Sequence, residues 1–143
     1  MNLYVGKNFP KVIMLSGEKG IGKFTLINHL LNYIFNEKSY DKTNNLIDKN
    51  SLIFDHIKNN TFPNIIYLKN FENNSLKIED IRNLKNNLSK SILQPGPRFT
   101  VFDDVEFLNN NCINALLKII EEPTKTNFFI LINNKQKSIL ETI

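Results

Sequence analysis

The sequence predicts an α/β fold in which helices cover both faces of a parallel sheet. Apolar runs typical of buried strands alternate with helical patterns along the chain. Three of the four runs are continuous, which is typical of strands buried on both faces. With 143 residues, of which 41% are hydrophobic, one domain spanning residues 1–143 can bury its own core.

The first half of the chain begins with a strand, a turn and a helix. Residues 12–15 form a short β-prone run that ends in a glycine turn. Residues 23–35 repeat apolar side chains at helical spacing, whereas residues 36–50 are polar and predict a surface loop. Ser51 is a suitable N-cap for a short helix through Lys58. The apolar stripe of the longer helix consists of Ile27, Leu30, Leu31 and Ile34.

The next strand and helix follow the same pattern. Residues 64–69 predict a second buried strand, and Glu79 or Asp80 begins a helix. Residues 94–97 contain two prolines and a glycine, so they end this helix before a third strand at residues 99–102. The apolar face of the helix consists of Ile81, Leu84, Leu88 and Ile92.

The last part of the chain predicts a helix, a strand and the start of another helix. Asn109 or Asn110 caps a helix that ends at Pro123. Residues 128–132 form the fourth apolar run, and residues 138–143 begin a helical pattern. The apolar stripe of the capped helix consists of Ile113, Leu116, Leu117 and Ile120.

The positive charge of the chain is carried almost entirely by lysine. The formal net charge is +4, and arginine occurs only at Arg82 and Arg98. Because the chain is also dense in Asn and Ile, we interpret the lysine excess as the codon bias of an AT-rich genome. A nucleic-acid-binding surface is the alternative interpretation.

The sequence has no evident membrane span or secretory leader, and its cysteine and histidines do not indicate a redox or metal site. No apolar run approaches the roughly 20 residues of a membrane span, and no secretory leader is evident, so we expect a cytoplasmic protein without membrane contact. Cys112 lies in a helical pattern and predicts a small buried residue. His29 and His56 have no partner at metal-ligand spacing and predict structural roles.

One glycine-rich segment predicts a phosphate-binding loop. Residues 17–23 fit the pattern G-x-x-x-x-G-K between a predicted strand and a predicted helix. The backbone at Gly17, Gly20 and Gly22 can turn its N–H groups toward phosphate oxygens, and Lys23 adds a positive charge at the helix N-terminus. A tight turn without a ligand is the alternative.

The residue after this lysine departs from the pattern. The motif requires Ser or Thr there, because the hydroxyl group binds Mg²⁺, but the position holds Phe24. Thr25 comes one residue late, and one residue rotates a side chain by about 100° around a helix. The loop therefore predicts phosphate binding rather than metal-assisted hydrolysis.

Two acids follow the third predicted strand. Asp103 stands where P-loop proteins place a second contact to Mg²⁺. The next position usually holds a Glu that activates water, and here it holds the shorter Asp104. The alternative is that both acids only begin a loop.

Residues 114–123 read Asn-Ala-Leu-Leu-Lys-Ile-Ile-Glu-Glu-Pro. Together with the loop at residues 17–23, this string resembles the AAA+ clamp-loader subunits of bacterial DNA polymerase III over essentially the whole chain. The resemblance implies a P-loop AAA+ three-layer sandwich with strand order 1-4-3-2. It also implies that the fifth strand, the lid and the collar domain are missing, as in a chain truncated at its C-terminal end.

Two subunit types of this family compete. The gamma/tau type carries an intact Gly-Lys-Thr and a four-cysteine zinc module, whereas this chain has Phe24 and a single cysteine, so no zinc is expected. The delta-prime type often has a displaced Thr, as at Thr25, and residues 78–82 resemble its helix start. We therefore interpret the chain as delta-prime-like, with gamma/tau-type ATPase and autonomous P-loop NTPase as alternatives.

The resemblance also implies partners and a site. It implies a stator-like part of the polymerase holoenzyme that acts with gamma/tau and delta subunits, the sliding clamp and primed DNA, and it leaves the chain's own ATPase activity open. Asn133 falls near the sensor 1 position, with Asn134 as the alternative. The nucleotide-binding candidates, for ATP with Mg²⁺, are Gly17, Gly20, Gly22, Lys23, Thr25 and Asn133, with Asp103 toward the metal and Asp104 at the Walker B Glu position.

Overall fold

In the computed structural model, four parallel strands form one sheet in the order β1-β6-β5-β4. This is the predicted order of first, fourth, third and second strand. The structure describes residues 9–70, 75–90, 94–121 and 124–135, and among them β1 lies at an edge of the sheet. The strands are β1 (Val12–Ser16), β4 (Ile65–Lys69), β5 (Arg98–Asp103) and β6 (Asn127–Asn133).

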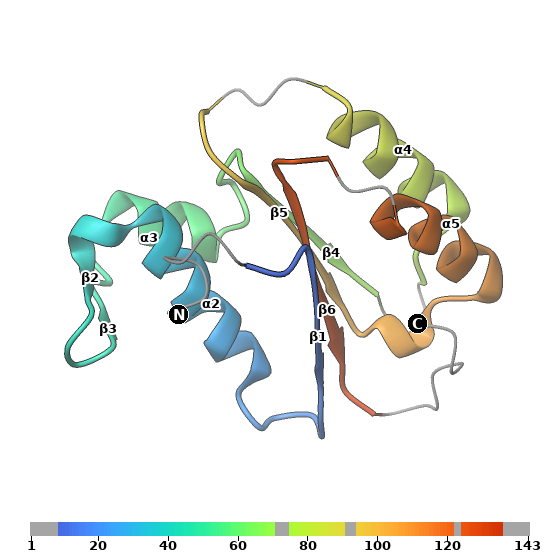
Figure 1. Cartoon of the computed structure of the whole chain (residues 1–143). Coiled ribbons are helices and arrows are strands. Elements are labelled where there is room, and N and C mark those ends of the chain that lie inside the picture. The colour runs from blue at the N-terminus through green and yellow to red at the C-terminus, as the bar shows by residue number, and fades with distance from the viewer. Residues whose placement is uncertain (1–8, 71–74, 91–93, 122–123, 136–143) are drawn as a thin grey trace.

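Helices cover both faces of this sheet, which confirms the predicted three-layer sandwich (Figure 1). On one face lie α2 (Lys23–Phe35) and α3 (Leu52–Lys58). On the other face lie α4 (Ile78–Leu88) and α5 (Asn110–Glu121), with the short turn η2 (Val105–Phe107) before α5.

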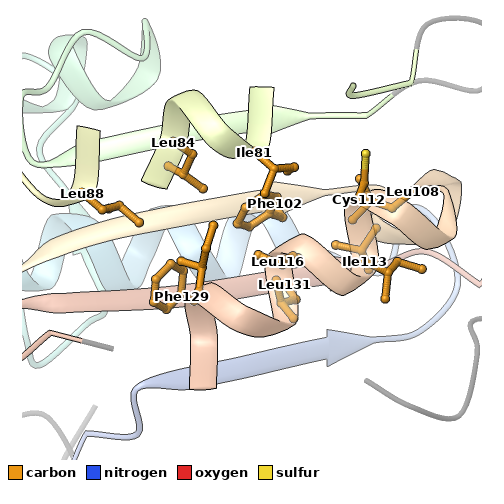
Figure 2. Close-up of a cluster of buried hydrophobic side chains, with 12 residues drawn as sticks. Ile81, Leu84, Leu88, Phe102, Leu108, Cys112, Ile113, Leu116, Phe129 and Leu131 are labelled. Atoms are coloured by element: carbon orange, nitrogen blue, oxygen red, sulfur yellow. The ribbon is translucent and has the colours of Figure 1, made fainter. Parts of the chain in front are cut away.

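Alternate residues of the central strands point into the two cores. Val101 packs with Ile27 on the α2 side, whereas its neighbour Phe102 packs with Ile81 and Leu116 on the α4 and α5 side. Figure 2 shows the second cluster, in which side chains of α4 and α5 meet those of the sheet. This alternation follows from the two-residue period of a strand, so each face has its own core.

The helix starts agree with the capping signals. The Oγ atom of Ser51 accepts the Phe54 N–H over 3.2 Å, and Oδ1 of Asn109 accepts the Cys112 N–H over 2.9 Å. Helix α4 begins at Ile78, just before the predicted starts Glu79 and Asp80, because Oδ2 of Asp80 accepts the Lys77 N–H over 2.8 Å and closes the first turn. Predictions for Ile92, Pro123 and residues 138–143 lie outside the described residues.

Residues 36–50 differ from the predicted surface loop. They contain a turn, η1 (Glu37–Ser39), and a small hairpin of β2 (Tyr40–Asp41) and β3 (Leu46–Ile47). Tyr40 is buried and packs edge-on against the rings of Tyr33 and His29. These aromatic contacts attach the segment to α2. The polar composition of the segment gave no sign of them in the sequence.

Candidate functional site

The glycine-rich loop joins the end of β1 to the start of α2. Gly20 and Gly22 have φ angles of +93° and +95°, a conformation that glycine adopts without the strain of a side chain. Gly22 lies directly before the first residue of α2. The predicted loop is therefore present between a strand and a helix, with its two special backbone positions occupied by glycines.

The lysine of the motif binds the loop itself. Its Nζ donates hydrogen bonds to the carbonyl oxygens of Gly17 and Glu18, over 2.8 and 2.7 Å. Lys23 is only 8% exposed, although it lines the cavity beside the loop. In this conformation the charge of Lys23 stabilises a closed loop.

Phe24 occupies the position where the motif places a metal-binding hydroxyl group. Phe24 is 49% exposed, and its ring meets the ring of Tyr67 edge-on, with 5.8 Å between centroids. Thr25 lines the same cavity one residue later. The two aromatic rings link the first turn of α2 to β4.

Tyr67 also contacts the Walker B candidate. Its hydroxyl group donates to Oδ2 of Asp103 over 2.7 Å, and Oδ1 of Asp103 accepts the Asp104 N–H over 3.0 Å. Burial and the adjacent Asp103 carboxylate raise the pKa of Tyr67 well above its usual range. The phenol is therefore a hydrogen-bond donor at neutral pH. Sequence reasoning missed Tyr67, because nothing in the pattern of its strand distinguishes it from a core residue.

These residues line a cavity of about 550 Å³ at the carboxyl ends of the strands. Lys19, Lys23 and Lys69 contribute positive charge to its wall, and Asp103 is the one acid among the described residues that line it. Ligands of α/β proteins bind at this end of a parallel sheet. The excess of cations fits an anionic group such as a phosphate.

The structure separates the two asparagines that compete for the sensor position. Nδ2 of Asn134 donates to Asp104 over 2.6 Å and lies 3.5 Å from Asp103, and Asn134 lines the cavity. Nδ2 of Asn133 instead donates to Ser16 over 3.3 Å. The preferred candidate, Asn133, is thus held by β1, and Asn134 is the asparagine that contacts the acids.

Asp104 does not share the cavity with Asp103. It is 5% exposed, has a φ angle of +57°, and is not among the residues that line the cavity. Its carboxylate accepts a hydrogen bond from Nδ2 of Asn134 over 2.6 Å. Its place at the Walker B Glu position therefore stays a prediction from the sequence.

The residues present do not fit a bound Mg²⁺. Mg²⁺ requires oxygen ligands, but Phe24 supplies none and Oδ2 of Asp103 already accepts a hydrogen bond from Tyr67. In the described part of the chain, no group of three or more His, Cys, Asp or Glu side chains could hold a metal ion. His29 and His56 instead contact Tyr40 and Thr61.

A second cavity, of about 370 Å³, lies between α4 and α5. Its polar rim includes Arg82, Lys85 and Lys118, and none of the acidic residues that the structure describes lines it. We call it the α4/α5 groove. Sequence reasoning treated these cations as part of a diffuse lysine excess. The signal was the three-residue spacing of Arg82 and Lys85, which places both on one side of a helix.

Two further findings concern the single cysteine and the character of the helices. Cys112 is fully buried, as predicted, and burial raises the pKa of its thiol. Among the described residues, no helix has both the length and the apolar character that a membrane span requires.

Comparisons with known proteins agree with this architecture. The chain is 26% identical over 144 residues to the DNA polymerase III subunit delta' of Buchnera aphidicola subsp. Baizongia pistaciae. It is 30% identical over 69 residues to the delta' subunit of Bacillus subtilis. The match to the Buchnera protein includes 98% of this chain but only 43% of that protein, so the chain spans less than half the length of that relative.

A solved structure supports the fold. The gamma subunit-related protein of Thermotoga maritima matches with a TM-score of 0.57 at 16% identity, over 94% of this chain and 38% of that one. The family model described as DNA polymerase III, delta subunit matches residues 2–143. Because that match runs along nearly the whole sequence, the chain belongs to the DNA polymerase III delta subunit family.

Proposed function

We propose that this chain acts as a delta-prime-like subunit of the DNA polymerase III clamp-loader complex, in the cytoplasm. In this role it helps to place the sliding clamp on primed DNA, in contact with gamma/tau and delta subunits. The family match and the delta' relatives support this assignment. Its contribution is structural, as a stator-like subunit, and ATP hydrolysis belongs to its partners.

The observation that carries the structural role is the state of the phosphate loop. Lys23 binds the carbonyl oxygens of its own loop, and Phe24 stands where hydrolysis requires a hydroxyl group. A gamma/tau-type ATPase or an autonomous P-loop NTPase needs a productive Mg²⁺ site. The loop therefore favours weak, metal-independent ATP binding or none.

Reconstitution with the cognate gamma/tau and delta subunits tests this proposal. We expect the full chain to co-elute with both subunits in gel filtration and to support clamp loading on primed DNA. We expect no steady-state ATP hydrolysis by the isolated chain, and no effect of Lys23→Ala on its background rate. Failure to bind either subunit would exclude the proposed role. ATP turnover that Lys23→Ala abolishes would favour the autonomous NTPase.

The α4/α5 groove favours a direct contact to the DNA within this role. Arg82, Lys85 and Lys118 converge on it from two helices, and Glu79 is the acid that pairs with Arg82, over 3.5 Å. Asn111 and Asn114 add amide groups to the same wall. Cations and amides of this kind bind DNA phosphates without reading sequence, which suits a protein that loads clamps at any primer.

A further inference from the structure

The corner between the phosphate loop and the strand ends contains a chain of three side chains. The Phe24 ring packs on Tyr67, and Tyr67 donates a hydrogen bond to Asp103. In a P-loop site that binds Mg²⁺, the metal links the residue at position 24 to the acid at position 103. Here two aromatic side chains make that link.

We infer that Tyr67 is the residue that excludes a divalent cation from this site, because its hydroxyl group occupies the space beside Oδ2 of Asp103 while its ring packs on Phe24. This inference rests on the proposed degenerate site and names the side chain responsible. It differs from the missing hydroxyl at position 24, because Tyr67 lies on another element, β4. The site is thus closed to metal from two sides.

The hydrogen bonds of Asp103 explain why the missing hydroxyl group at Phe24 is not the only obstacle to a divalent cation. Oδ2 accepts from Tyr67 over 2.7 Å, and Oδ1 accepts from the Asp104 N–H over 3.0 Å, with Asn134 at 3.5 Å. A cation would have to lie about 2 Å from one of these oxygens. The phenol oxygen of Tyr67 lies 2.7 Å from Oδ2, so a cation bound by a threonine at position 24 would have to displace the phenol or share Oδ2 with it.

Three variants of the full chain test the inference: Phe24→Thr, Tyr67→Phe and the double variant. ADP affinity is measured by calorimetry with Mg²⁺ and with EDTA. We expect less than a twofold effect of Mg²⁺ for the wild type and each single variant, and at least about tenfold tighter binding with Mg²⁺ for the double variant.

Three results would overturn the inference. Metal dependence in the wild type, or a full gain in Phe24→Thr alone, means that Tyr67 does not exclude the cation. No metal dependence in the double variant means that these two residues are not what keeps it out. Subunit assembly is a separate readout. Failure of the metal-binding test would not affect the proposed clamp-loader role, and failure of subunit assembly would not affect the inference about Tyr67.

A stability measurement keeps the test independent of nucleotide. Tyr67→Phe should reduce the folding equilibrium constant about tenfold in the wild-type background and by less than about twofold in an Asp103→Ala background. Tyr33→Phe, on α2, is the matched control and should have little effect in either. An equal cost of Tyr67→Phe in both backgrounds would show that Tyr67 and Asp103 are not coupled.

Discussion

The ammonium group of Lys23 donates a hydrogen bond to the carbonyl oxygen of Gly17 over 2.8 Å, so the last residue of the phosphate loop binds the first. A second bond reaches the carbonyl oxygen of Glu18 over 2.7 Å. In a working site the lysine of this motif contacts phosphate. In this chain it closes the loop against the start of α2.

Replacing this lysine should therefore destabilise the protein. Lys23→Met leaves two carbonyl oxygens without their donor, at a cost of about 2 kcal/mol in the free energy of unfolding, measured by urea denaturation. Lys19→Met is the control, because Lys19 is an exposed lysine of the same loop, and it should change stability by less than about 0.5 kcal/mol. Equal effects of the two substitutions would contradict a structural role for Lys23.

The neighbouring asparagines at the end of β6 should differ in importance. Asn134→Ala removes the donor to Asp104 and leaves a buried carboxylate without it, which should cost about 2 kcal/mol. Asn133→Ala should cost less, because its partner Ser16 is exposed. Thermal unfolding of both variants measures the difference, and the opposite ranking would favour Asn133 as the organising residue.

The α4/α5 groove should bind DNA phosphates. Exchanging Lys85 and Lys118 together for alanine should weaken binding to primed DNA and reduce the slope of log affinity against log salt by about two. Fluorescence anisotropy over a salt series measures both effects in the assembled complex. Lys58→Ala is the control, because Lys58 lies on α3, which covers the other face of the sheet. An unchanged salt slope would remove the groove from the DNA path.

Substitution by lysine should affect the stability of the protein differently at the two arginines. Arg98 is buried, and its guanidinium donates to the carbonyl oxygens of Asn87 and Lys90 over 2.8 and 3.3 Å, at the C-terminal end of α4. Arg98→Lys loses this fork and should cost about 1.5 kcal/mol. Arg82→Lys changes an exposed side chain and should be nearly neutral. Urea denaturation compares the two, and equal stabilities would contradict the capping role of Arg98.

Much of the fold was predictable because its signals are local. The helix at Lys23–Phe35 has the predicted bounds, since its apolar stripe and the glycine before it are adjacent in sequence. The resemblance to clamp-loader subunits then supplied the strand order, which periodicity alone does not contain. The hairpin at residues 40–47 was missed because Tyr40 is buried by rings of α2, and a polar segment gives no sign of such a contact.

The sequence by itself determined the alternation of strands and helices, the position of the glycine-rich loop and the absence of a hydroxyl group at Phe24. Each depends on residues close together in the chain. Only the tertiary structure decided that Asn134 contacts the acids, because a shift of one residue at a strand end reverses the direction of a side chain. It alone also joined Tyr67 to Asp103, since 36 residues separate them and only the pairing of β4 with β5 brings them together.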